Sequence, residues 1–201
     1  MASKVDIFNL ALANIAHKAQ VADPDEVTPE ANHCRRFYPV ALSAALARYA
    51  WSFASRRVAL AEVTNPLDHW SFAYALPNPC IAPRAVLLPE STDDTNEQPF
   101  KVEATADGGS VLYTNVEDAV LKYTTLVTDT TKFSPLFVLV LSYDLASMLA
   151  GPIPKDPKLK KAMLDAAAYY TGLAQATDAN SSGRGGDAYN DFIPAHLKAR
   201  G

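Results

Sequence analysis

The chain has 201 residues, of which 49% are apolar and 20% charged, as in a globular protein with a substantial core. Its net charge of −4 and pI of about 5.5 exclude a bulk attraction to nucleic acid, which needs a concentrated basic surface. Two cysteines, Cys34 and Cys80, are too few for a disulfide framework and are expected to be reduced thiols. No secretion signal or membrane-length apolar run is recognised, so a soluble protein is expected.

Two helices are expected in the first 50 residues. Apolar side chains recur at helical spacing over residues 3–18 and again over residues 28–49. The second helix has Thr28 as its N-cap and Pro29 at its first position, where a missing N–H is harmless. Pro39 lies inside this stripe and predicts either a kink or two abutting helices.

The pattern then becomes extended and stays so to about residue 132. Residues 106–110 contain Gly108 and Gly109 and predict a hairpin turn, and residues 91–98 are polar and predict a loop. Six segments have the composition of strands: 57–63, 70–75, 81–88, 99–104, 111–114 and 119–127.

Helices resume at Ser134. Residues 136–150 are apolar nearly all round, which predicts a helix at the buried centre of a bundle. The last long helix should run from Asp156 to about Ala176, and a Ser/Gly-rich linker follows it. Its inward residues should be Leu159, Met163, Ala166, Ala167 and Tyr170.

The order of helices, then strands, then helices favours the α+β class over a parallel sheet. We expect a helical bundle from residues 1–50 and 133–178, with an antiparallel β domain inserted at 51–132. Residues 179–201 should form a flexible linker and a C-terminal docking tail.

Motifs for chemistry are sparse. No nucleophile elbow or phosphate-binding glycine pattern occurs, and no two of the four histidines have a ligand spacing. We therefore expect no metal, no cofactor and no catalytic residues. The histidines are His17, His33, His69 and His196.

Three groups leave alternatives open. The acidic loop at Glu90, Asp93, Asp94 and Glu97 is either a solvated loop tip or an acid–base pair for glycoside cleavage. The lysines at 155, 158, 160 and 161 form either a solvated face or a contact with an acidic partner or nucleic acid. The aromatic residues from Trp51 to Tyr74 are either core residues or a base-stacking surface.

The junction at residues 50–57 combines two aromatics with two arginines. We interpret it as a packed corner in which Trp51, Phe53 and Arg57 pin a helix to the sheet. Trp70 and Tyr74 should complete this structural junction from the first strands.

Five short motifs follow one another along the chain. They are Phe8-Asn9-x-Ala11-Leu12, Cys34-Arg35-Arg36-Phe37-Tyr38, Trp51-Ser52-Phe53-Ala54-x-x-Arg57, Trp70-x-x-Ala73-Tyr74-x-Leu76-Pro77 and Ala146-x-x-Leu149-Ala150. Together they resemble the head-to-tail adaptor of short-tailed, podovirus-type bacteriophages, the tail tubular protein A family.

The resemblance implies a structural virion protein in the neck or tail, made in the host cytoplasm. Such proteins form a ring of twelve subunits between the portal and the tail nozzle, and DNA passes through the lumen without specific binding. No membrane contact and no enzymatic role are implied. The free subunit should be mostly monomeric, and its predicted portal-docking residues are Phe192, Ile193, Leu197 and Arg200.

Two other hypotheses stay open. One is a virion-associated peptidoglycan hydrolase acting through the acidic loop around Glu90 and Glu97. The other is an unrelated binding module that uses its aromatic sheet.

Overall fold

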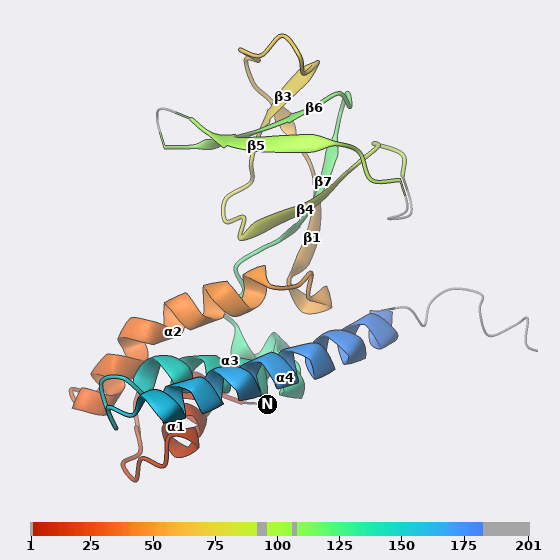
Figure 1. The fold of residues 1–201 in the computed structure, drawn as a ribbon. Helices are drawn as coiled ribbons and strands as arrows, with labels where there is room; N and C mark the ends of the chain where they lie inside the picture. Colours follow the sequence, from red (N-terminus) through yellow and green to blue (C-terminus); the bar gives the residue numbers. More distant parts are fainter. Residues whose placement is uncertain (1, 92–95, 106–107, 183–201) are drawn as a thin grey trace, which may run out of the picture.

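The computed structural model describes residues 2–91, 96–105 and 108–182. The four portal-docking candidates, the linker after Ser182, His196, Asp93 and Asp94 lie outside these ranges. Within them, the α+β class is confirmed: four helices accompany two antiparallel sheets. Figure 1 shows the helices gathered in one body and the strands in a second body above it.

The helical body is formed by α1 (Lys4–Asn14), α2 (Pro29–Ala47), α3 (Pro135–Leu149) and α4 (Pro157–Ser182). Three of these helices begin at a hydroxyl N-cap, as their sequences predict: Ser3, Thr28 and Ser134 each accept a bond from the first turn. Most of α3 is buried, and it contacts each of the other three helices. The prediction of a central apolar helix is therefore confirmed.

The structure corrects the prediction for α4 and decides between the alternatives for α2. α2 is one continuous helix and not two abutting helices, and Pro39 lies in its interior with its side chain exposed. α4 continues past Ala176 to Ser182, so the predicted end was wrong. Thr177 bonds back to the Leu173 carbonyl and Asp178 bonds across the body to Ser52, and these contacts hold the last turns together.

The β part contains two sheets. The first has the order β1 (Ser55–Ala59), β7 (Val120–Thr124), β4 (Ala82–Leu87). The second has the order β2 (Ala61–Glu62), β3 (Phe72–Ala75), β6 (Ser110–Thr114), β5 (Phe100–Ala104). The first predicted strand is thus split at Leu60, where the chain passes from one sheet to the other. The predicted β5–β6 hairpin is present, and Gly108 takes the positive φ of 82° that its turn requires.

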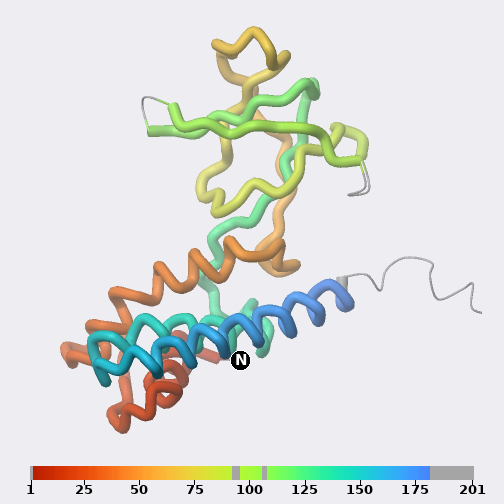
Figure 2. Tube along the Cα trace, in the orientation of Figure 1, coloured from red at the N-terminus to blue at the C-terminus, as the bar shows by residue number. Residues whose placement is uncertain are grey.

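The buried apolar residues form two separate clusters. The larger one lies among the helices and the smaller one among the strands, around Tyr74, Leu112 and Leu121. The larger cluster also takes in Trp51 and Val127, which were assigned by sequence to the β domain. The domain boundaries themselves stay a prediction. Figure 2 shows that the chain crosses between the two bodies twice, after α2 and again before α3.

Candidate interaction surface

The aromatic junction belongs to the helical core. Trp51 is 1% exposed, and its Nε1 donates to the Ala45 carbonyl at 2.9 Å. Its ring meets that of Phe137 edge-on, with 5.1 Å between the ring centroids, and stacks with that of Phe53, with 6.3 Å between the centroids. The ring centroids of Phe53 and Phe137 are 4.9 Å apart. Trp51 and Phe53 therefore fill a corner between helices, and the interpretation that they pin a helix to the sheet needs correction.

The other junction candidates lie in the β part. Arg57 is exposed on β1, opposite Lys122 of β7. Tyr74 is 2% exposed, and its hydroxyl donates to the Val116 carbonyl at 2.9 Å, so it is a core residue of the sheets. Trp70 is half-buried and precedes β3.

Arg84 on β4 makes the contact between helix and sheet that sequence reasoning missed. Its Nη2 donates to the carbonyls of Leu46, Ala47 and Tyr49 at 3.2, 2.9 and 2.8 Å. Its Nε donates to Thr124 Oγ1 at 2.9 Å. These carbonyls lie at the end of α2, where backbone acceptors have no helical partner and a cation is favourable. An arginine inside an apolar strand was the available signal.

Two other residues of the quoted motifs organise loops. The Asn9 side chain pairs with both backbone groups of Val21, at 2.9 and 2.8 Å. Arg35 donates to the carbonyls of Pro24 and Glu26, each at 2.9 Å. Both side chains therefore fix the segment between α1 and α2.

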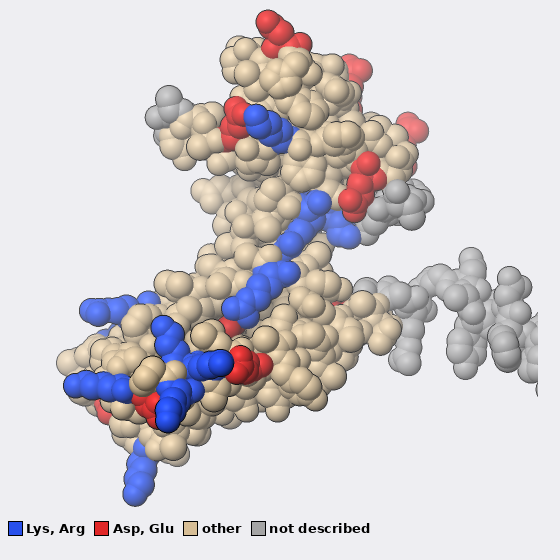
Figure 3. Space-filling model, in the orientation of Figure 1, with Lys and Arg blue, Asp and Glu red and all other residues tan. Residues whose placement is uncertain are grey.

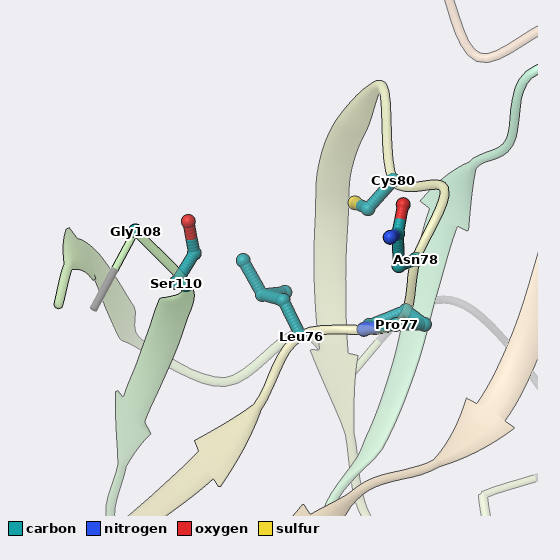
Figure 4. Close-up of a pocket in the computed structure, with 7 residues that line it drawn as sticks. Leu76, Pro77, Asn78, Cys80, Gly108 and Ser110 are labelled. Atoms are coloured by element: carbon teal, nitrogen blue, oxygen red, sulfur yellow. The ribbon is translucent and has the colours of Figure 1, made fainter.

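A small pocket lies in the β part, between the β3–β4 loop and the β5–β6 hairpin. Figure 4 shows Leu76, Asn78 and Cys80 on one side of it and Gly108 and Ser110 on the other. Burial raises the pKa of the Cys80 thiol, which keeps it protonated and poorly nucleophilic. The pocket has no feature that selects a ligand.

A buried ion pair lies between α2 and α3. Arg48, the C-cap of α2, donates to both carboxylate oxygens of Asp144 at 2.7 and 2.9 Å. The Asp144 side chain is 3% exposed and that of Arg48 is 38% exposed. Burial raises the pKa of Asp144, and the Arg48 guanidinium opposes that rise.

A groove runs along α4 beside this ion pair and has a volume of about 340 Å³. The α4 side of the groove includes Leu164, Ala168 and Gly172. A Cβ added at Gly172 would meet no atom within 4 Å, so the groove is open there. The groove thus lies between α4 and the Arg48–Asp144 ion pair, and the polar residues Thr171 and Gln175 also line it.

α4 also exposes apolar side chains away from the groove. Tyr169 and Leu173 are 68% and 44% exposed and lie one turn apart, about 140–180° around the helix from Leu164, which is 46% exposed. Ala176 is exposed one turn beyond Leu173. Figure 3 shows Lys and Arg gathered where α4 begins, while the rest of this helix carries few charges. Of the five residues predicted to face inward, Leu159, Met163 and Tyr170 pack against the helical core and Ala167 is buried, while Ala166 is half-buried.

The remaining candidates do not converge on a described site. Glu90 and Glu97 are both exposed, whereas a glycosidase acid depends on a cleft that desolvates it. The Nε2 atom of His17 lies 3.0 Å from the Oε1 atom of Glu30. Cys34 is buried, and burial raises the pKa of its thiol to about 12. Among the described residues, no group of three or more His, Cys, Asp or Glu side chains is placed to hold a metal ion.

Comparison of the whole sequence with models of known protein families found no match, and neither did a search of curated proteins. In the part of the chain that the structure describes, no helix combines the length and apolar character needed to cross a lipid bilayer.

Proposed function

We propose that this chain is a head-to-tail connector subunit of a short-tailed bacteriophage. In this role its copies assemble side by side into a ring between the portal and the tail nozzle, and DNA passes through the lumen. The location is the neck or tail of the virion, and the action is structural.

The observation that carries this proposal is the outer face of α4. On this helix of 26 residues, Tyr169 and Leu173 lie one turn apart on the same side and are 68% and 44% exposed, which gives an apolar area typical of protein contacts. Leu164 lies on another side of the helix, at the groove. A surface helix with such a face is suited to a neighbouring subunit.

The two-part shape also supports the proposal. The helical body offers a surface for neighbours in a ring, and the β part projects from one side of that body (Figure 1). Arg84 on β4 links the two parts through three hydrogen bonds to backbone carbonyls at the end of α2. A subunit that contacts neighbours through one part and an axial partner through the other needs such a link.

The overall charge is compatible with a DNA conduit. With a net charge of −4, the subunit has no strong general attraction for the phosphate backbone, which would otherwise retard the passing DNA. The sequence motifs described above add the resemblance to the connector family.

Negative-stain imaging of the chain with and without the portal protein tests the proposal. We expect rings seated on the portal and few or no rings of the free chain. A portal that stays bare at saturating chain concentration contradicts the proposal. The same imaging with a chain ending at Gly186 tests the docking residues Phe192, Ile193, Leu197 and Arg200, because their loss should weaken portal binding.

A further inference from the structure

The α4 groove has a basic rim at one end. Lys160 and Lys161 precede Leu164 by four and three residues, so they lie beside it on the helix surface. Both lysines are exposed. On the other side of the groove the Arg48 guanidinium is paired with Asp144, so the net positive charge at the groove comes from the two lysines. An occupant of this groove should therefore bring an apolar side chain flanked by acidic groups.

The loop between α1 and α2 presents a side chain of this kind. Val27 is 90% exposed, more than any other large apolar residue of the described chain. It follows Asp23 and Asp25, which are also exposed. We call Asp23, Asp25 and Val27 the acidic knob.

Local structure does not explain why Val27 is in solvent. It directly precedes the N-cap Thr28, a position from which an apolar residue often packs on the fourth residue of the helix. That residue is Asn32, which offers no apolar partner. The exposure of Val27 thus contributes nothing to the capping of α2.

The loop that carries the knob is nonetheless firmly held. The Glu26 carboxylate accepts from the backbone N–H groups of Ala22 and Asp23 at 3.0 and 3.2 Å. The Thr28 hydroxyl donates to the same carboxylate at 2.7 Å, and Arg35 holds the carbonyl of Glu26. A preorganised loop loses little conformational freedom on binding, which favours a contact role.

We infer that the acidic knob of one copy docks into the α4 groove of a second copy. Val27 would lie against Leu164 and Ala168, one turn apart on α4, with Asp23 and Asp25 near Lys160 and Lys161. Because knob and groove are different surfaces, the contact is heterologous and repeats from copy to copy, closing a ring when the rotation allows. The inference rests on the self-association that the proposed function requires.

Paired cysteine variants test the contact in the full-length chain. Val27→Cys and Gly172→Cys chains, both carrying Cys80→Ser, are mixed and treated with a short bismaleimide, first alone and then on the portal. We expect a crosslinked dimer from the mixture, at least about tenfold above that from a matched mixture of Val40→Cys with Gly172→Cys. Val40 is 57% exposed but lies outside the knob.

Charge reversal supplies a second readout. Lys160→Glu with Lys161→Glu should reduce the crosslink strongly, and Asp23→Lys with Asp25→Lys on the other chain should restore it. All these positions are exposed or open, so circular dichroism should show folded variants. Equal crosslinking at Val27 and Val40, or none at Val27 either alone or on the portal, overturns the inference. Rings imaged on the portal together with such a result would leave the proposed function standing and discard only this contact.

Discussion

At the scale of single residues, Arg48 and Asp144 form an ion pair that joins α2 to α3. Their exposures differ, since the carboxylate is almost fully buried while the guanidinium reaches solvent. Removing one partner of such a pair therefore has unequal consequences. Loss of the arginine leaves a buried charge without compensation, whereas loss of the carboxylate leaves a cation that water can solvate.

We predict that Arg48→Met lowers the free energy of unfolding by about 3 kcal/mol at neutral pH, and Asp144→Asn by only about 1 kcal/mol. Burial already raises the pKa of Asp144, and losing Arg48 raises it further. A carboxyl with a higher pKa in the folded state loses stability as pH rises past its unfolded pKa. The deficit of Arg48→Met should therefore shrink toward acidic pH. Urea unfolding at several pH values measures the loss of unfolding free energy in Arg48→Met. A loss that does not change with pH contradicts this explanation.

Trp51 gives the second residue-scale prediction. Because its ring is enclosed by Phe53 and Phe137, Trp51→Ala should lower the free energy of unfolding by ~3–5 kcal/mol. Tyr169→Ala is the control, since this ring is 68% exposed and its loss should change stability by less than about 0.5 kcal/mol. Urea titrations of both variants provide the comparison. Full stability of Trp51→Ala would mean that Trp51 is not a core residue.

At the scale of elements, Arg84 sets how the sheets sit on the helices. We predict that Arg84→Met lowers the free energy of unfolding by about 2–3 kcal/mol, because three carbonyls at the end of α2 lose a charged donor. Hydrogen exchange should accelerate at the end of α2 and in β7, while α1 stays protected. Arg56→Met is the matched control on β1, because this exposed arginine donates to the carbonyl of its own neighbour Ser55 and not to α2. Uniform acceleration of hydrogen exchange over the whole chain would contradict a local role of Arg84 at the contact between helix and sheet.

The elements also show what sequence pattern can and cannot supply. Helix starts follow from local capping at Ser3, Thr28 and Ser134, so they were predictable. The split at Leu60 and the extension of α4 to Ser182 depend on pairing and contacts between distant segments. The α4 surface was equally hidden, because apolar residues such as Tyr169 and Leu173 give the same helical pattern whether or not another helix covers them.

At the scale of the whole molecule, the functional account depends on association. Exposed apolar side chains lie on α4, and the firmly held loop before α2 exposes Val27. The helical body thus carries two distinct surfaces suited to contacts with copies of itself, while the β part projects away from them (Figure 1). A connector subunit needs this combination of lateral contacts and a projecting part.

The mass of the complex between the full-length chain and the portal tests this account most directly. Native mass spectrometry of the purified complex counts the chains bound to each portal. The account predicts a closed set of copies, twelve if the family resemblance holds, with few partly filled assemblies. A portal that carries no copies, or single copies in proportion to the amount added, would contradict a ring-forming connector.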